Sequence, residues 1–279
     1  MNQELARMPL PDTSPDTPPN DEAPDAVPVP RSMLPHLNEM ALLLDIDGTL
    51  LDLAPTPREV WVPPGLAKTL NRLLERTSGA LALVSGRSLN DIDLIFAPEE
   101  FPAVGGHGAE MRLAIDSEAV ATHAPPMDKE LKRRLAAIAR LSPGILLEDK
   151  GYSLALHYRL APHAEKAIYA AVSLIRADLP NAPIEVLPGK CVCEIKHSGF
   201  NKATGVRELM THEPFRGRHP IFIGDDVTDE SVFAVMPDLG GLAFSVGRRA
   251  KGVAGHFDEP RDVREWLARL IDGEAAAAR

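Results

Sequence analysis

Cysteines and aromatic residues are scarce in this sequence. Its 279 residues include two cysteines, Cys191 and Cys193, and 5% Phe, Trp and Tyr. Two cysteines so close together exclude the disulfide framework of a small secreted domain. No second Cys or His pair stands at metal-ligand spacing. Residues two apart on a strand point to the same side, so we expect both cysteines to pack in a core.

The sequence also lacks an excess of basic residues and long apolar runs. Lys and Arg number 30 against 40 Asp and Glu, which gives a formal net charge of -10. This balance argues against a nucleic-acid partner, although a few placed basic residues can still hold a small anion. No run approaches the roughly 20 apolar residues of a membrane helix, and the first residues do not resemble a signal peptide. We therefore expect a cytoplasmic protein without membrane contact.

Residues 1–35 are rich in Pro, Asp and Thr and almost free of large apolar side chains. Such a segment cannot bury enough surface to offset the entropy that ordering costs. We expect a disordered tail, and the sequence does not reveal what the tail does.

Apolar runs that end in polar residues alternate with helical patterns in two separate parts of the chain. Residues 40–47 and 80–84 are typical of strands buried on both faces, and leucines at helical spacing lie between them at 64–77. An apolar strand of the same kind returns at 219–226. This alternation predicts a parallel sheet covered by helices. We also expect a helix from Ser88, a strand near 103–104, a helix near 229–236, a strand at 241–246 and a helix at 261–271.

The middle of the chain, residues 111–196, has a different pattern. Its expected elements are strand-like pieces at 111–115 and 119–124, a helix with Leu131, Leu135, Ile138 and Leu141 on one face, and a second helix at 163–178. Two alternating strands complete it. The apolar face of the first strand carries Tyr152, Leu154, Leu156 and Tyr158, and the apolar face of the second carries Cys191, Cys193 and Ile195. We predict an α+β cap inserted into a core made of residues 36–110 and 197–279.

Two carboxylates follow the first buried strand, in the sequence DIDGTL (45–50). Ligands of doubly wound sheets bind beyond the carboxyl ends of the strands, where Asp45 and Asp47 fall. Both project the same way, so one carboxylate could attack phosphorus while the other serves as acid and base. Their repulsion would be relieved by a divalent cation. An acidic strand end is the alternative, but four preceding apolar residues favour the catalytic interpretation.

Three further polar stretches follow in the chain. Ser85 and Gly86, in VSGR, offer a hydroxyl and backbone amides to phosphate oxygens. Lys202 opens a helical stretch and could pair with both phosphate and Asp45. The third stretch, GDDVTDE, suits a hard cation that prefers oxygen ligands. Its aspartates are Asp225, Asp226 and Asp229.

The order DxDGT, SGR, Lys and GDDxTDE resembles that of the haloacid dehalogenase superfamily over about residues 40–265. The resemblance implies an α/β fold with a Rossmann-like parallel-sheet core and an inserted α+β cap of the C2 type. It also implies magnesium-dependent phosphate transfer through an aspartyl-phosphate. The implied catalytic residues are Asp45 as nucleophile, Asp47 as general acid and base, and Lys202. Phosphate would be bound by Ser85, Gly86 and Lys202, and Mg²⁺ by Asp45, Asp47, Asp225 and Asp226.

Narrower motifs resemble the trehalose-6-phosphate phosphatase family. They are GGHGAE (105–110), LEDKGYSLALHYR (147–159), LPGKCVCEIK (187–196) and GDDVTDE. The resemblance implies a phosphoric monoester hydrolase that converts trehalose 6-phosphate to trehalose and phosphate, the last step of trehalose biosynthesis. Charged groups on one face of the cap suit the many hydroxyls of a disaccharide. The implied substrate-binding residues are Arg87, His107, Glu148, Lys150, Arg159, Lys190 and Glu194.

Two positions depart from the family pattern. His197 follows EIK where the family often has proline, and Ala203 follows Lys202 where glycine is usual. Neither departure removes a catalytic group. For His107, the Gly-rich setting is as easily that of a tight loop as that of a substrate contact. Sucrose 6-phosphate or another sugar phosphate stays open as substrate. A phosphomutase and a non-catalytic domain that binds sugar phosphates are the further alternatives, and association with a trehalose-phosphate synthase is also left open.

Overall fold

The computed structural model describes residues 34–54, 59–115, 117, 124, 126–189 and 191–277, the last six of these in backbone only. Nearly all of the predicted tail therefore lies outside the described residues. The same holds for most of the strand expected at 119–124 and for Lys190.

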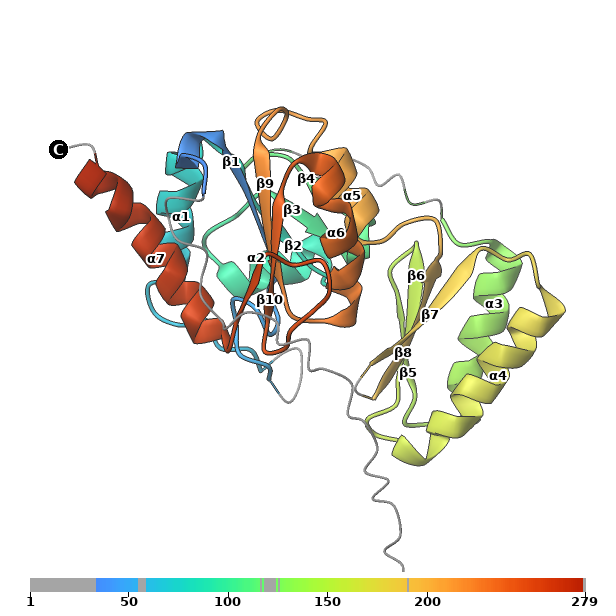
Figure 1. Ribbon diagram of the computed structural model, residues 1–279. Helices are drawn as coiled ribbons and strands as arrows, with labels where there is room; N and C mark the ends of the chain where they lie inside the picture. The colour runs from blue at the N-terminus through green and yellow to red at the C-terminus, as the bar shows by residue number, and fades with distance from the viewer. Residues whose placement is uncertain are drawn as a thin grey trace, which may run out of the picture.

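Seven strands form the larger of two sheets, in the order β11-β10-β9-β1-β2-β3-β4 (Figure 1). All neighbours are parallel except β3 and β4, which run antiparallel. The central strand β1 is buried at every position, because helices cover both faces of the sheet. The strands are β1 (Met40–Leu44), β2 (Leu81–Val84), β3 (Ala103–Gly105), β4 (Glu110–Arg112), β9 (His219–Gly224), β10 (Leu242–Val246) and β11 (Gly255–Phe257).

Alternate residues of β1 face two different layers of helices. Leu42 and Leu44 pack in one core cluster with α1 (Leu66–Arg76), α2 (Leu89–Phe96) and α7 (Pro260–Ala277). Ala41 and Leu43 pack in a second cluster with α5 (Lys202–Leu209) and α6 (Glu230–Val235). Figure 1 shows these two helix layers on opposite sides of the sheet. No helix of the described part is long and apolar enough to cross a membrane.

A smaller antiparallel sheet, in the order β5-β6-β8-β7, forms the cap. Its helices α3 and α4 lie on the side away from the larger sheet (Figure 1). The register pairs Leu154 with Ile195 and Leu156 with Cys193, and all four residues pack against those helices. The cap elements are α3 (Lys129–Ala137), β5 (Leu146–Asp149), β6 (Ser153–His157), α4 (Glu165–Asp178), β7 (Ile184–Gly189) and β8 (Val192–His197).

Six short 3-10 helices complete the described elements. They are η2 (Leu37–Glu39), η3 (Gly106–Gly108), η4 (Ile138–Leu141), η5 (Pro162–Ala164), η6 (Val227–Asp229) and η7 (Pro237–Leu239). Two of them, η3 and η6, follow strands of the larger sheet and lie at the site described below. The elements predicted from the sequence for the larger sheet and its helices all have counterparts, and the chain is an α/β protein with an inserted cap.

The strand expected at 111–115 was wrongly assigned to the cap. It is β4, which pairs with β3 at the edge of the larger sheet, so these residues belong to the core, and Leu113 packs there too. Alternation alone could not reveal this, because an edge strand of either sheet shows the same pattern. Return to the core at residue 197 stays a prediction. β5 and β7 were not expected.

Three side chains differ from their expected positions in the cap. Leu141 ends a 3-10 turn and is 54% exposed, because the tighter turn rotates it off the apolar face of α3. Cys191 precedes β8 with a positive φ of 61°, so only Cys193 is a strand residue on the buried face. Tyr152 lies outside the cap core and packs in a separate cluster with Ala109 and Phe200.

The buried face of β1 gives a stability prediction. Leu42 has no exposed surface, so Leu42→Ala should lower the free energy of unfolding by about 2–5 kcal/mol through lost burial and a cavity. Urea unfolding followed by circular dichroism measures this change. Leu94→Ala is the control, because Leu94 is 71% exposed and its loss should cost about 0.5 kcal/mol or less. Equal losses in the two variants would contradict the layered core.

Candidate active site

Three aspartates converge at the carboxyl ends of the central strands. Asp45 follows β1, and its N–H donates to Ile223 of the neighbouring β9 at 3.0 Å. Asp225 follows β9, and Asp229 ends η6. Carboxylate oxygens of Asp45, Asp225 and Asp229 lie within 4.8 Å of one another. Adjacent parallel strands thus bring together acids that are far apart in the sequence.

Lys202 neutralises part of this charge. Its Nζ donates to Asp45 Oδ1 and to Asp229 Oδ1, both at 2.7 Å, and the side chain is 4% exposed. Lys202 is the first residue of α5, and Asn201 caps that helix by accepting from the Thr204 N–H at 3.0 Å. The contact between Lys202 and Asp45, predicted from the sequence, is confirmed.

The crowding of these charges shifts their pKa values. Burial raises the pKa of Asp45 well above its usual range against the opposing effect of Lys202, and Asp229 and Asp225 raise it further. Burial and Asp229 raise the pKa of Asp225 to about 6. Burial alone would lower the pKa of Lys202, but Asp45 and Asp229 together raise it above its ordinary value. One ammonium thus lies among three carboxyl groups, and the environment disfavours ionisation of Asp45 and Asp225.

Gly48 allows Asp225 to approach the DIDGTL loop. Its φ is 81°, in the left-handed region, and a Cβ on Gly48 would lie 2.0 Å from Asp225 Oδ2. A side chain at this position would therefore displace Asp225 from the group. The glycine of the motif has a steric role in forming the site.

The acidic group fits a hard divalent cation. Asp225 Oδ1 is buried and has no hydrogen-bond partner among the described residues. Such an oxygen, beside other carboxylates, suits Mg²⁺, which prefers oxygen ligands. Asp229 Oδ2 is already engaged by the N–H groups of Asp225 and Asp226, at 3.0 and 3.1 Å. Asp45 and Asp225 are therefore the carboxylates best placed to bind a metal.

Asp226 and Asp47 lie outside this acidic group. The exposed Asp226 precedes η6 as its N-cap residue, and its Oδ1 accepts from the Thr228 N–H at 2.6 Å. Arg87 binds both oxygens of Asp47, at 2.5 and 2.6 Å. The geometry thus gives the carboxylate of Asp226 a capping contact, and that of Asp47 an arginine partner. The arrangement does not favour either side chain as a metal ligand.

The SGR motif lies beside the same strand ends. Ser85 follows β2, is 2% exposed, and its Oγ accepts from the Arg87 N–H at 3.2 Å. Gly86 follows it and packs against the His107 ring. The Arg87 guanidinium, predicted to bind substrate, points instead to Asp47. Phosphate-binding roles for Ser85 and Gly86 stay predictions.

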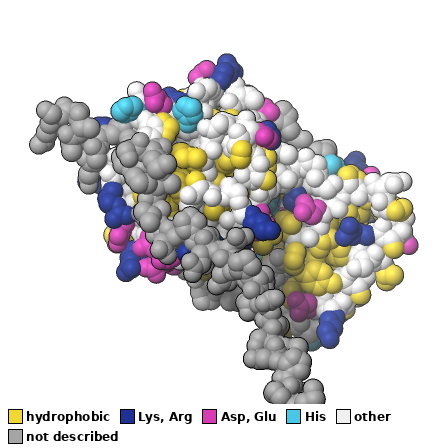
Figure 2. Space-filling model, in the orientation of Figure 1, with side chains coloured by type: hydrophobic (Ala, Val, Ile, Leu, Met, Phe, Trp, Pro, Cys, Tyr) yellow, Lys and Arg dark blue, Asp and Glu magenta, His cyan; other side chains and the backbone are white. Residues whose placement is uncertain are grey.

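His107 connects this loop to the cap. The backbone N–H of His107 donates to the Ser85 carbonyl at 3.1 Å, and the ring Nε2 lies 3.9 Å from Oε2 of Glu194 in the cap strand β8. Burial lowers the pKa of His107 to about 4, although Glu194 opposes this shift. The imidazole is therefore neutral at pH 7. Figure 2 shows acidic and basic side chains on the surface where core and cap meet.

Glu194 contacts two polar side chains of the cap, one of which is a predicted sugar-binding group. Its Oε1 accepts from Ser153 Oγ at 2.8 Å and lies 3.5 Å from Lys150 Nζ. Glu148, also predicted, pairs instead with His157 at 2.9 Å on the edge strand β5. Arg159 is exposed beyond β6. The structure thus brings Lys150, Glu194 and His107 together, whereas Lys190 lies outside the described residues.

Sequence reasoning left three residues of this region without a role, and it considered Asp229 only as part of a cation-binding motif. Asp229 belongs to a recognised motif, but only the fold reveals its contact with Lys202. Arg248 donates to the carbonyl groups of Asp225 and Asp226, at 2.9 and 3.0 Å, and no sequence signal marks it. Tyr152 and Glu110 form a hydrogen bond between cap and core. Their motifs, KGYSLAL and GGHGAE, were noted only for the family resemblance.

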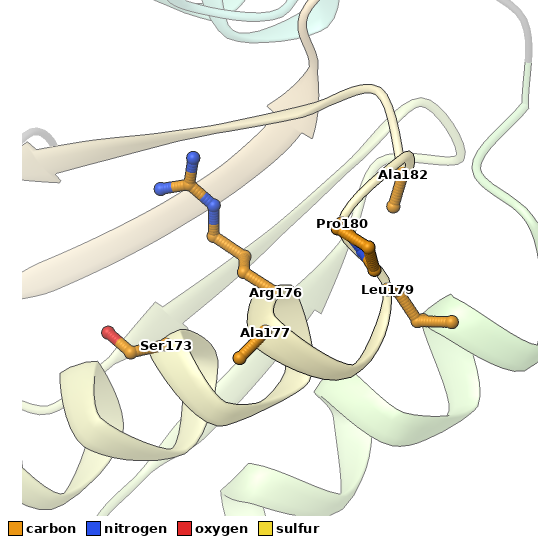
Figure 3. A pocket seen from close by; sticks show the side chains of 6 residues that line it. All are labelled: Ser173, Arg176, Ala177, Leu179, Pro180 and Ala182. Atoms are coloured by element: carbon orange, nitrogen blue, oxygen red, sulfur yellow. The ribbon is translucent and has the colours of Figure 1, made fainter.

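A separate pocket lies at the C-terminal end of α4 in the cap (Figure 3). Its lining residues are Ser173, Arg176, Ala177, Leu179, Pro180 and Ala182. None of them belongs to the predicted site. Arg176 is the charged side chain among them, so this pocket lacks the paired acids that the chemistry at Asp45 requires.

Comparison with known proteins identifies the family. The trehalose-phosphatase family model matches residues 43–259. The chain is 38% identical over 243 residues to the trehalose-6-phosphate phosphatase of Escherichia coli K12, covering 86% of this chain and 90% of that protein. It is 44% identical over 213 residues to the probable trehalose-phosphate phosphatase of Sinorhizobium fredii, with 76% and 79% covered.

Solved structures agree on the fold. The C-terminal domain of Candida albicans trehalose-6-phosphate phosphatase matches with a TM-score of 0.69 and 22% identity, covering 84% of this chain and 92% of that domain. A trehalose-6-phosphate phosphatase related protein matches with a TM-score of 0.64 and 23% identity, covering 85% and 99%. The chain therefore belongs to the trehalose-phosphatase family, whose members are phosphoric monoester hydrolases of the haloacid dehalogenase fold.

Proposed function

We propose that the protein hydrolyses trehalose 6-phosphate to trehalose and phosphate, with Mg²⁺ and through an aspartyl-phosphate on Asp45. The observation that carries this proposal is the buried contact of Lys202 with Asp45 and Asp229 at the strand ends. The names of the two similar relatives support the substrate. The Glu194–Lys150 pair of the cap supports recognition of a sugar.

Two chemical steps transfer the phosphoryl group to water. The Asp45 carboxylate attacks phosphorus, the bond from phosphorus to the sugar oxygen breaks, and Asp47 gives its proton to that oxygen. Asp47 then takes a proton from water, which attacks phosphorus and releases phosphate and Asp45. Asp47 lies two residues from Asp45, and because Arg87 engages both of its oxygens, these proton transfers require Arg87 to release one of them when substrate binds.

Asp45 and Asp225 would hold Mg²⁺, with Asp229 beside them. The bound cation supplies charge neutralisation for the carboxylates and the phosphoryl oxygens. Lys202 adds a fixed positive charge next to Asp45. Ser85 and the Gly86 backbone would bind the remaining phosphoryl oxygens, which is the role that their motif predicts.

Lys150 and Glu194 would bind sugar hydroxyls, and His107, neutral at pH 7, would assist from the core side. We retain Glu148, Arg159 and Lys190 as further sugar contacts from the sequence prediction. Groups that hydrogen-bond hydroxyls discriminate steeply, because a wrong sugar leaves polar atoms unpaired. We also propose a cytoplasmic location and no nucleic-acid partner, in keeping with the net charge of -10. Association with a trehalose-phosphate synthase is no part of the proposal.

A panel of sugar phosphates tests the proposal directly. Phosphate release is measured for trehalose, sucrose, glucose and mannose phosphates, with Mg²⁺ and with a chelator. We expect fast hydrolysis of trehalose 6-phosphate and none after chelation. Metal-dependent hydrolysis of another sugar phosphate would overturn the substrate but not the chemistry. No phosphate release from any compound would favour a binding protein.

Asp45→Asn should abolish turnover while keeping the fold. The amide cannot form the aspartyl-phosphate, and Lys202 retains Asp229 as a partner. We expect a loss of at least ~10³-fold in kcat, as for the removal of other covalent nucleophiles. Steady-state kinetics measure the loss, and circular dichroism checks the fold. Near-normal activity in the variant would contradict the role of Asp45 as nucleophile.

The two adjacent aspartates of GDDVTDE should differ in metal dependence. Asp225→Asn replaces a buried oxygen that lacks a partner, so the Mg²⁺ concentration for half-maximal activity should rise by at least about tenfold. Asp226→Asn is the matched control, because its carboxylate caps η6, and the change should stay below about threefold. A larger effect in Asp226→Asn would restore the sequence-based assignment of that residue to the metal.

Glu194→Gln should weaken the sugar without altering the chemistry. The amide keeps the size of the side chain but loses the charge that faces Lys150 and Ser153, so we expect KM for trehalose 6-phosphate to rise about tenfold. Activity on p-nitrophenyl phosphate, which has no sugar, should be retained. Glu130→Gln on the exposed side of α3 serves as control. Equal losses on both substrates would contradict sugar binding by Glu194.

A further inference from the structure

Tyr152 of the cap packs against Gly106 and Glu110 of the core. Tyr152 is 6% exposed, and its Oη donates to Oε1 of Glu110 on β4 at 2.9 Å. Its ring packs edge to face on Phe200, with centroids 5.9 Å apart. Phe200 lies between β8 and α5, where the chain returns from cap to core. Tyr152 therefore contacts two separate parts of the core.

The core provides a fitted position for the tyrosine hydroxyl. A Cβ on Gly106 would lie 2.2 Å from Tyr152 Oη, so a side chain at this position would exclude the hydroxyl. Gly106 has a φ of 54°, and its N–H donates to the Arg87 carbonyl at 2.7 Å. Glycine is thus needed at residue 106 both for the backbone conformation and for the approach of the cap.

Glu110 connects Tyr152 to the loop that holds Arg87. Its second oxygen, Oε2, accepts from the N–H of Leu89 at 2.6 Å, at the first residue of α2. Arg87 lies two residues earlier and binds Asp47. One carboxylate therefore receives a hydrogen bond from the cap and another from the end of the SGR loop.

On the cap side, Tyr152 belongs to the turn that carries Lys150. The turn is tight: the Lys150 N–H donates to the Ser153 carbonyl at 3.0 Å, and the Gly151 N–H donates to Asp149 at 2.9 Å. Lys150 and Ser153 both contact Glu194. Fixing Tyr152 against the core thus fixes the position of the sugar-facing groups relative to the phosphate site.

We propose that Tyr152 and Glu110 are positioning residues, whose hydrogen bond aligns the sugar-binding turn of the cap with the Arg87–Asp47 pair. For its effect on turnover, this inference rests on the proposed function. The Tyr152 hydroxyl is occupied by Glu110 and its ring by Phe200, so it acts through Lys150, Glu194 and Glu110. The contact matters for a substrate that spans both sites and is dispensable for a small phosphate ester that occupies the core site alone.

Tyr152→Phe tests the inference, because it removes the hydroxyl and keeps the ring packed on Phe200. We expect kcat/KM for trehalose 6-phosphate to fall about tenfold, the effect of losing a hydrogen bond to a charged acceptor. Activity on p-nitrophenyl phosphate should stay within about twofold. Equal losses on the two substrates would indicate a merely structural role and overturn the proposal, as would no loss on either.

Tyr158→Phe is the matched control within the same chain. Tyr158 is also buried and donates to a glutamate, Glu165, at 2.8 Å, but both residues belong to the cap. Loss of the Tyr158 hydroxyl should leave the ratio of the activity on trehalose 6-phosphate to the activity on p-nitrophenyl phosphate unchanged. An equal change of that ratio in Tyr158→Phe would overturn the assignment to the junction between cap and core.

A double-mutant cycle tests the partnership with Glu110. Adding Glu110→Gln to Tyr152→Phe should lower the ratio of the two activities little beyond the single variants, because both changes weaken one contact: glutamine is uncharged and has a single acceptor oxygen for the Tyr152 hydroxyl and the Leu89 N–H. Fully additive losses would show that the residues act separately and would overturn their pairing.

Hydrogen–deuterium exchange tests the contact without any substrate. In Tyr152→Phe, exchange of the turn at residues 149–153 should accelerate severalfold, and in Tyr158→Phe it should not. Unchanged exchange in Tyr152→Phe would overturn the proposal even in an active enzyme. Accelerated exchange in a protein inactive on trehalose 6-phosphate would support the contact and refute the proposed function instead.

Discussion

The buried ammonium of Lys202 is the interaction on which the site depends. It joins Asp45 at the end of β1, Asp229 at the end of η6, and α5, whose first residue it is. A buried charge is tolerated only when it is paired and hydrogen-bonded, so each of the three elements must be correctly placed for the others to be stable. Lys202 lies 157 residues from Asp45 in the sequence. The active site and the core fold are consequently one structure.

The same group holds more carboxyl groups than ammonium groups. Three carboxylates share one ammonium, and burial raises the pKa of both Asp45 and Asp225. A fold that keeps such a group unbalanced is suited to a cation and to a phosphoryl group that is bound together with it. Gly48 and Arg248 maintain this arrangement by steric and hydrogen-bonding contacts, without adding a carboxylate or an ammonium to the group.

The insertion of the cap between β4 and α5 gives the site its second half. The last cap strand, β8, leads through Phe200 directly to Lys202 at the start of α5. His107 and Tyr152 then bridge the two parts at separate points, one near Glu194 and the other at Glu110. Under the proposed function, these contacts would couple recognition of a sugar to transfer of its phosphate.

The sequence by itself determined the parallel sheet, its helices and the position of Asp45, Asp47 and Ser85 after buried strands and of Lys202 at the start of a helix, because buried strands followed by short polar motifs are local signals. Only the tertiary structure decided which acids meet. Asp229, and not Asp226 of the same motif, contacts Lys202. The Arg87 guanidinium binds the Asp47 carboxylate. The structure also shows that β4 belongs to the larger sheet and that Tyr152 lies outside the cap core, both contrary to the sequence prediction. These outcomes depend on contacts between segments far apart in the chain, and periodicity and spacing carry no information about such contacts.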